Sequence, residues 1–433
     1  MSGSAMSDVP SSRHRRLLLT AALGCALPGC GKKPAIPPRR AAEWLLTPGA
    51  SPPDWSKLDP WQRTVTKEQF KRLLENILTE TGGWVSHIDL REDAAHIRMA
   101  TPHANGPRYV LEFARAGTAP GSGPRYWRSL EELPPLRDPA RPLEGLHIAL
   151  DPGHIGGSWA QMEERYEKSG NAPPVKEGEL TLRTARVLAP QLEALGAKVS
   201  HVRTRPEPVT KVRPGDLKDE ARASLAQDGA EVNSHSLQKE AERLFYRAHE
   251  VRARGALVND TLRPDLVICL HYNADAWGDA ARTIFSPFNH LHVLAHGCIL
   301  DGEFSLDDQR LEGLLRLVQG ISDTEIPLCI AVAHRMAEAT ALPPYTYRHH
   351  ARMIEGQPYV WLRNLIANRV YQCPVVYCEP YVQNNGEVVA RFQAGDYDGN
   401  APVAGKDRPS IFREYAAGVV AGLSDYFAAR KRA

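Results

Sequence analysis

Two histidines and two glutamates stand where regular elements of the chain are expected to begin or end. His154 follows a short apolar strand that ends at Leu150, in a loop whose glycines and proline let the backbone approach a bound group closely. Glu177 opens a helical pattern, and two further apolar runs end in His271 and Glu379. Such element ends converge in an open α/β sheet, so these side chains are expected to lie close together.

These residue types suit a zinc site with a hydrolytic function. Two imidazoles and one carboxylate form a three-ligand protein set for zinc and leave a fourth position for water, which gives the ligand roles to His154, Glu177 and His271. Zinc lowers the pKa of its bound water to about 7, so Glu379 can take the proton and pass it to a leaving amine. The set predicts amide hydrolysis, although a single histidine at a strand end is more often only a hydrogen-bonding residue.

Blocks of sequence surround these residues in one order along the chain: 149–157, 177–183, 202–205, 270–275 and 375–385. In this order they resemble the zinc-dependent N-acetylmuramoyl-L-alanine amidases, which cut peptidoglycan between N-acetylmuramic acid and the first residue of the stem peptide. The resemblance runs from about Leu146 to the C-terminus. It implies the α/β fold of that family, one zinc ion per chain held by His154, Glu177 and His271, and Glu379 as the catalytic residue.

The carboxylate ligand has competitors nearby in the sequence. These are Glu163, Glu164, Glu167 and Glu179. Glu177 is preferred because it keeps the family's spacing to Leu182, which places the apolar side of the helix correctly. A glutamate at a helix start is also favoured by the helix macrodipole, so the same residue has a purely structural interpretation.

Two long segments depart from the family pattern, at about residues 206–232 and 279–350. Long additions to compact domains are commonly either functional lids or disordered. Within the second segment, leucines recur at helical spacing over residues 303–315, behind a serine, Ser305, that could cap a helix. One hypothesis is that this helix covers and gates the cleft. The alternative is that both segments are peripheral additions.

His290, His292 and His296 form a second candidate metal site, because residues two apart share one face of a strand. Residues 289–294 alternate polar and apolar side chains as a half-buried strand does, so solvated or hydrogen-bonded histidines explain the pattern as well. His349 and His350 are treated in the same way. We therefore favour a single metal site.

Charge and the N-terminal sequence indicate where the protein works. With 53 basic and 51 acidic residues the formal net charge is +2, which offers no broad footprint for nucleic acid. A basic stretch at residues 13–16 precedes an apolar stretch, 17–27, that is too short to span a bilayer as a mature helix. Cys30 then ends a stretch similar to a bacterial lipobox. We expect an exported protein of the periplasm or cell envelope, anchored to a membrane by a lipid on Cys30.

Composition divides the chain into five parts. They are a signal peptide (1–30), a tether rich in proline and basic residues (31–53), a small α+β domain (54–116), a Gly/Pro-rich linker (117–143) and the catalytic domain (144–433). In the small domain, Thr66 and Gln69 form a capping-box signature before an apolar helical stripe. Alternating residues after this helix predict three antiparallel strands.

The catalytic domain alternates strands and helices, which predicts a mixed, largely parallel sheet flanked by helices. Strands are expected near 146–150, 198–203, 265–270, 290–294 and 375–378, and helices near 179–195, 236–259, 326–340, 359–371 and 410–429. Pro190 predicts a kink or break in the first of these helices. Five cysteines follow Cys30, and this odd number argues against a disulfide framework.

The leading interpretation is a zinc amidase that acts on peptidoglycan in the cell envelope. Two alternatives stay open: an envelope lipoprotein without activity that binds murein or a protein partner, and a zinc peptidase that acts on stem peptides. They differ in loops that the sequence does not place. Whether an activator protein exists does not follow from the sequence.

Overall fold

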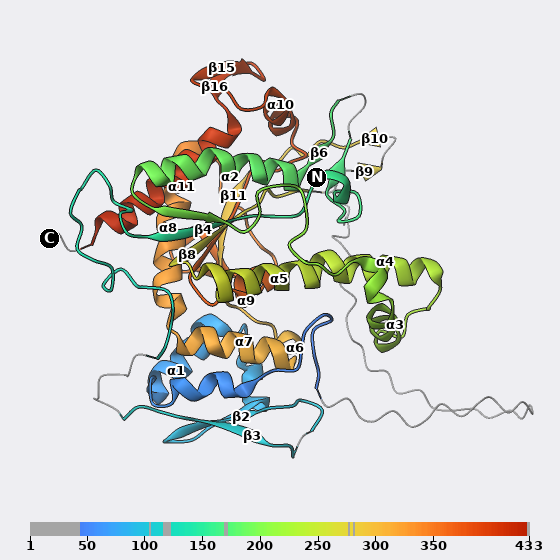
Figure 1. Ribbon diagram of the computed structural model, residues 1–433, viewed down its shortest axis with the longest axis vertical. Coiled ribbons are helices and arrows are strands. Elements are labelled where there is room, and N and C mark those ends of the chain that lie inside the picture. The colour runs from blue at the N-terminus through green and yellow to red at the C-terminus, as the bar shows by residue number, and fades with distance from the viewer. Residues whose placement is uncertain are drawn as a thin grey trace, which may run out of the picture. The chain divides into compact units, whose positions relative to one another are not determined.

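The computed structural model describes residues 44–103, 105–115, 123–168, 172–275, 278–279 and 282–430 (Figure 1). The expected signal peptide, Cys30 and most of the expected tether lie outside these residues. One compact unit extends over Glu43–Ala433. Within the described part of the chain, no helix is both long enough and apolar enough to cross a bilayer.

A mixed sheet of seven strands, counted over the described residues, carries the fold in the order β12-β13-β11-β14-β8-β4-β7. Its strands are β4 (His147–Pro152), β7 (Lys198–His201), β8 (Leu266–Leu270), β11 (Leu291–Ala295), β12 (Arg352–Ile354), β13 (Gln357–Leu362) and β14 (Val375–Pro380). Strands β7, β4, β8 and β14 are parallel, β11 is antiparallel to β14 and parallel to β13, and β12 is antiparallel to β13. The predicted mixed, largely parallel sheet is therefore confirmed.

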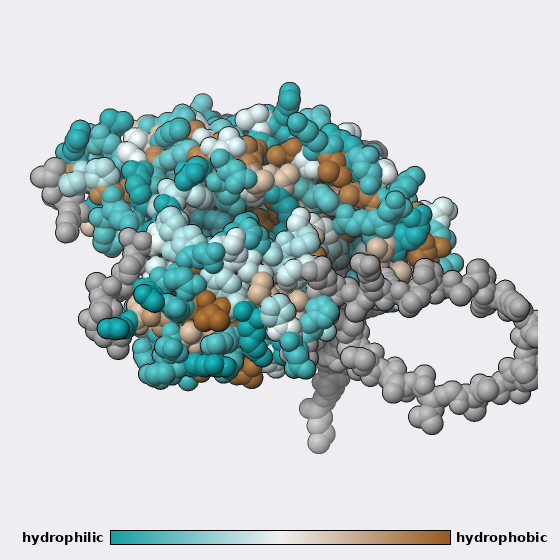
Figure 2. Space-filling model, turned by 60° about the horizontal axis from the view of Figure 1, so that its bottom comes forward, coloured by the Kyte–Doolittle hydropathy of each residue, from teal (hydrophilic) through white to brown (hydrophobic). Residues whose placement is uncertain are grey.

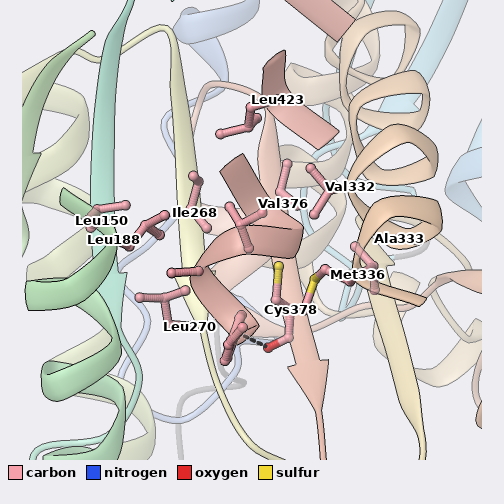
Figure 3. Packing of buried hydrophobic residues seen from close by; sticks show 14 of the residues in the cluster. Leu150, Leu188, Ile268, Leu270, Val332, Ala333, Met336, Val376, Cys378 and Leu423 are labelled. Atoms are coloured by element: carbon pink, nitrogen blue, oxygen red, sulfur yellow. Dashed lines mark hydrogen bonds between the residues drawn. The ribbon is translucent and has the colours of Figure 1, made fainter. Parts of the chain in front are cut away.

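Both faces of this sheet are buried, because successive side chains of each central strand point to opposite sides. One face contributes these residues to an apolar cluster (Figure 3): Leu150, Ile268, Leu270, Val376 and Cys378. The other face contributes these residues to a second cluster: Ala149, Val267, Cys269, Val375 and Tyr377. Strands covered on both sides need continuous apolar runs, which explains why the sequence of β8 is apolar throughout.

Three long helices cover the first face. They are α2 (Glu177–Ala194), α8 (Ile321–Thr340) and α11 (Ile411–Ala428). Leu188 of α2, Val332 of α8 and Leu423 of α11 pack into the cluster shown in Figure 3. The start of α2 is thereby fixed against the ends of β4 and β8, which matters for the site described below.

A helical rod and a short helix cover the opposite face. The rod consists of α4 (Ser234–Leu244), η6 (Phe245–His249), α5 (Glu250–Ala256) and η7 (Leu257–Leu262), and the short helix is α9 (Ile366–Val370). Val258 and Val370 join the apolar cluster of this face. Figure 1 shows the rod continuing away from the sheet toward α3 (Lys218–Gln227).

A smaller module lies at the N-terminal end of the described chain. It contains η1 (Trp55–Trp61), α1 (Lys67–Leu73), η2 (Leu74–Leu78), η3 (Gly82–Ser86) and the antiparallel strands β1 (Ile88–Leu90), β2 (Ala94–Arg98) and β3 (Arg108–Glu112). The Thr66 hydroxyl accepts the Gln69 N–H, and the Gln69 side chain accepts the Thr66 N–H. The predicted capping box and the three strands are both present.

The core of this module is completed by a helix from far along the chain. Helix α7 (Asp307–Val318), which follows α6 (Asp301–Phe304), places Leu311 and Leu314 in one cluster with Phe70 and Leu74. Figure 1 shows α7 beside α1. The hypothesis of a covering helix is therefore wrong for this segment, because the leucines that suggested it belong to a core. Ser305 is not its cap either, since the residue before α7 is Leu306.

Three further expectations need correction. The helix expected at 359–371 is wrong, because its first half is strand β13 and only Ile366–Val370 is helical. Helix α2 continues through Pro190 without a break. The end of the expected tether is not free, because the Leu45 N–H donates to Asp307 at 2.7 Å.

The remaining elements are short. They are the hairpins β5 (Tyr166–Glu167) with β6 (Val175–Lys176), β9 (Gly278–Asp279) with β10 (Arg282–Thr283) and β15 (Asn400–Val403) with β16 (Lys406–Pro409), the turns η4 (Gly157–Trp159) and η5 (Pro214–Leu217), and helix α10 (Gly386–Ala394). The five described cysteines are buried free thiols. Figure 2 shows a largely hydrophilic face with apolar side chains in small separate groups.

Candidate metal centre and active site

The structure brings three of the four predicted residues into one cluster. Ligand atoms of His154, Glu177 and His271 all lie within 4.8 Å of one another. Among the described residues, this is the one group of three or more His, Cys, Asp or Glu side chains with spacing suitable for a metal ion. The cluster lies where the parallel strands β4 and β8 end and α2 begins.

His154 lies on a loop that is held tightly after β4. Its φ of 58° is left-handed, which is uncommon for a residue other than glycine. The buried guanidinium of Arg254 donates to the His154 carbonyl at 2.8 Å, and that of Arg203 donates to the carbonyls of Gly153 and Ile155 at 3.0 and 3.1 Å. These charged donors fix the loop that presents the imidazole.

Glu177, the first residue of α2, is the centre of the cluster. Its Oε2 lies 3.2 Å from His154 Nε2, and its Oε1 lies 3.2 Å from His271 Nδ1. The Gln383 side-chain amide donates to Oε2 at 2.8 Å, and the Tyr272 N–H donates to Oε1 at 3.1 Å. Burial alone would raise the pKa of Glu177, but the two histidines hold it well below its usual value. The group is therefore an ionised carboxylate.

His271 follows β8 and is packed between an aromatic ring and a glycine. Its ring stacks on Tyr377 with centroids 4.5 Å apart and an angle of 11° between the planes. A Cβ on Gly153 would lie 2.1 Å from the His271 ring, so only glycine permits this approach. Burial lowers the pKa of His271, which favours the neutral form that binds metal.

Glu379 lies near the end of β14, the strand next to β8. Burial, and next the charge of Glu177, raise its pKa to about 8, while Arg363 and His154 act in the opposite direction. Two carboxyl groups of one site thus have pKa values shifted in opposite directions. Such a pair separates roles, with one group permanently charged and the other able to exchange a proton near neutral pH.

A cleft of about 300 Å³ opens onto His154 and His271. Its lining also includes residues 365–367 at α9 and these side chains: Asp151, Ile155, Glu163, Arg165, Tyr246, Arg247, Glu250, Val251, Arg254 and Tyr377. The two histidines of the cluster are therefore accessible to a ligand through this cleft.

The competing glutamates do not join the three-residue cluster. Glu179 is half-exposed and pairs with Lys176 at 3.0 Å. Glu164 is exposed, and the side chain of Glu167 is partly buried in β5. Glu163 is buried and lies 3.7 Å from His154, but at Nδ1, on the opposite side of the ring from Glu177. Glu177 is thus the glutamate that faces both histidines.

The other candidate histidines lie outside this cluster, three of them buried and two exposed. The Tyr347 hydroxyl lies 2.8 Å from His292 Nε2, and His290 packs against Tyr345 with ring centroids 4.5 Å apart. His296 lies beside Arg316, whose charge, after burial, lowers its pKa. His349 and His350 are exposed and contact each other.

Sequence reasoning missed several residues of the site. Arg165 has its Nε 3.4 Å from both His154 Nε2 and Glu177 Oε2, and Gln383 binds Glu177. Arg203 and Arg254 hold the His154 loop. Only the block at 202–205 carried a signal for Arg203, whereas Arg165 and Arg254 come from segments without a motif.

The residues present fit a zinc ion. Ligand atoms about 2 Å from a tetrahedral ion lie roughly 3.3 Å apart. Each histidine has a nitrogen 3.2 Å from a different oxygen of Glu177, and one ligand atom from each of the three residues lies within 4.8 Å of the others. Two imidazoles and an ionised carboxylate are the donor types of hydrolytic zinc sites with one open position. Burial would lower the pKa of His154, but the charge of Glu177 and the hydrogen-bonding contributions of Glu163 and Glu177 together raise it, so the site favours positive charge.

No family model and no curated protein match the chain. The structures that it resembles include the N-acetylmuramyl-L-alanine amidase of Mycobacterium smegmatis, with 17% identity, 66% of this chain and 98% of that chain covered, and a TM-score of 0.37. Another is the N-acetylmuramoyl-L-alanine amidase of Clostridium difficile, with 14% identity, 66% and 99% coverage and a TM-score of 0.35. The amidase of Nostoc punctiforme has 13% identity, 65% and 98% coverage and a TM-score of 0.32. At these values the similarity carries no inference about function, which depends on the site itself.

Proposed function

We propose that this protein is a zinc-dependent hydrolase that cleaves the amide bond between N-acetylmuramic acid and L-alanine in peptidoglycan. The observation that carries the proposal is the convergence of His154, Glu177 and His271 on one point at an open cleft, with Glu379 close enough for the Glu177 charge to raise its pKa. Three neutral or anionic ligands leave a zinc ion with net positive charge and one free position.

The residues of the chain have distinct tasks in this reaction. Zinc, when bound, would polarise the scissile carbonyl and a water molecule and stabilise the charge that develops on oxygen. Glu177 contributes negative charge and holds both imidazoles in place. Glu379 in its ionised form takes the proton of the attacking water, and its pKa, raised to about 8, favours the protonated form that then returns the proton to the nitrogen of the leaving alanine.

Two partly exposed arginines of the cleft are available to an anionic substrate. Arg165 and Arg247 line the cleft and are both partly exposed, with side-chain exposures of 37% and 48%. The stem peptides of peptidoglycan carry carboxylates, so charge complementarity would orient a stem peptide along this side. The resemblance of the sequence blocks to the amidase family supports the same substrate.

The proposed location is the periplasm or cell envelope. The basic and apolar residues at 13–27 support export, and Cys30 supports a lipid anchor to the membrane. Peptidoglycan would then be reached from an anchored enzyme.

Mass spectrometry of purified peptidoglycan, after incubation with the zinc-loaded protein, tests this function. We expect release of intact stem peptides with a free L-alanine N-terminus and loss of these products in a chelated control. Products cut within the stem would show a peptidase instead. A protein that binds one zinc ion and murein but yields no products would be a binding protein.

A further inference from the structure

Glu163 is a buried carboxylate that the proposed reaction does not use. It is 2% exposed and belongs to the segment between the first two metal ligands. Its Oε1 accepts the Gly156 N–H at 2.7 Å, and its two oxygens accept the Ile155 N–H at 3.0 and 2.9 Å. A carboxylate removed from water in this way is costly unless its partners are well placed, so the contacts call for an explanation.

The backbone around these contacts is shaped to hold an anion. Both amides follow His154 directly, and the φ angles of His154 and Gly156 are 58° and 79°. Left-handed residues in such a turn direct successive N–H groups toward one point, which forms a small anion-binding concavity. The carboxylate of Glu163 fills this concavity. Glu163 therefore binds backbone N–H groups of the His154 loop, whereas Arg203 and Arg254 bind backbone carbonyls of the same loop.

The same carboxylate faces the His154 ring. Glu163 Oε2 lies 3.7 Å from Nδ1, while Glu177 Oε2 lies 3.2 Å from Nε2. At 3.7 Å the contact to Nδ1 is electrostatic rather than a close hydrogen bond. A carboxylate on this side favours a proton on Nδ1 and leaves the Nε2 lone pair directed at the cluster.

We propose that Glu163 is a positioning residue for His154, which holds the loop through two amides and the ring through Nδ1 so that Nε2 points at the metal. The inference rests on the metal site of the proposed function. Carboxylates that bind the second nitrogen of a metal-bound histidine raise ligand basicity and fix ring orientation. Glu163 additionally binds the backbone of the histidine's own loop, so one side chain sets both the position and the rotation of the ring.

The test is zinc affinity, measured by competition with a chromophoric chelator for the full-length protein. Glu163→Gln keeps an oxygen that can accept the two amides but removes the charge facing Nδ1. We expect its zinc affinity to fall by about 10- to 100-fold. Glu164→Gln is the matched control, because Glu164 is the next residue, is exposed and does not contact the ring, and it should bind zinc like the wild type.

A second measurement uses the wild-type protein alone and decides the matter if Glu163→Gln does not fold. In ¹⁵N NMR of the zinc-loaded protein, His154 should show a metal-bound Nε2 and a protonated Nδ1 whose hydrogen exchanges slowly. Metal on Nδ1 would overturn the proposal, and so would equal zinc affinities of a folded Glu163→Gln protein and the wild type.

These outcomes separate the inference from the proposed function. Zinc binding that weakens in Glu163→Gln without any peptidoglycan hydrolysis by the wild type supports the positioning role and contradicts the amidase. Hydrolysis with unchanged zinc affinity does the reverse. A wild-type protein that binds no zinc contradicts both.

Discussion

Two regions of the molecule bury a histidine among charged side chains, and they differ in what the charges contact. In the N-terminal module, Arg310 and Asp307 are fully buried and paired at 2.5 Å, and Arg310 also donates to the carbonyls of Phe304 and Arg98. His87 completes this group. At the C-terminal ends of strands β4 and β8, by contrast, Glu177 faces two imidazoles beside a cleft. Buried charges that satisfy one another stabilise a fold, whereas charges that converge on an open position are available to a ligand.

We expect the largest effect when the ion pair of Arg310 with Asp307 in the N-terminal module is broken. Arg310→Met leaves the Asp307 carboxylate buried without its cation, which should lower the free energy of unfolding by about 3–5 kcal/mol. Urea unfolding measures this change. Arg335→Met is the control, since its ion pairs with Glu338 and Asp425 are exposed and their loss should leave the free energy of unfolding nearly unchanged. Similar losses in both variants would contradict the contrast between the two regions.

In the candidate active site, Glu379→Gln should slow hydrolysis by about 100-fold or more, because the group that moves the proton is lost. This loss of rate corresponds to an activation free energy higher by about 2.7 kcal/mol. Zinc binding should persist, since Glu379 is not one of the three ligands. Turnover assays and metal analysis of the same preparation measure both. Near-normal turnover would remove Glu379 from the reaction.

Acid should weaken the module through His87. Burial, and next the charges of Arg310 and Arg98, lower the pKa of folded His87 to about 4, against the weaker pull of Asp307 and Asp301. The unfolded chain takes up this proton near pH 6.5, so the stability is present at pH 7 and declines as the pH falls from about 6.5 toward 4.

We expect a loss of about 2 kcal/mol between pH 7 and pH 5 from this histidine. Unfolding at both pH values, compared between the wild type and His87→Gln, isolates its share. A wild type and variant with the same pH dependence would show that His87 is not responsible.

We expect the smallest effect from Glu179→Gln, a variant that tests which glutamate is the metal ligand. Glu179→Gln removes only a half-exposed pair with Lys176, so zinc affinity and activity should stay within experimental error. Glu177→Gln should lose most zinc affinity. The two variants differ by two positions in one helix, and reversed results would reassign the ligand.

The sequence predicts well the strands, which follow from the pattern of apolar residues, and the site residues that lie at the ends of those strands. Strands such as β8 follow from their apolar runs. The positions of His154 and His271 follow from the strands that precede them, and that of Glu379 follows from the strand near whose end it lies.

What failed depended on partners distant in sequence. Residues 359–362 are apolar and short, so the pattern does not distinguish helix from strand, and pairing with β11 decides for β13. The leucine spacing of α7 fits a helix that covers the cleft as well as a helix of a core, and only the packing with Phe70 distinguishes the two. Glu163 and Arg165 belong to no sequence motif. Their roles arise because their segment packs against the loop that carries His154.

Helix α7 also has a consequence for the order in which the chain can fold. Thr101 of the module binds Asp307 of this helix across 206 residues of sequence. During synthesis from the N-terminus, the module's strands therefore appear long before the helix that covers Phe70 and Leu74. Its apolar side stays without a cover until most of the sheet has been made, and closing so long a loop makes this core a late and slow step.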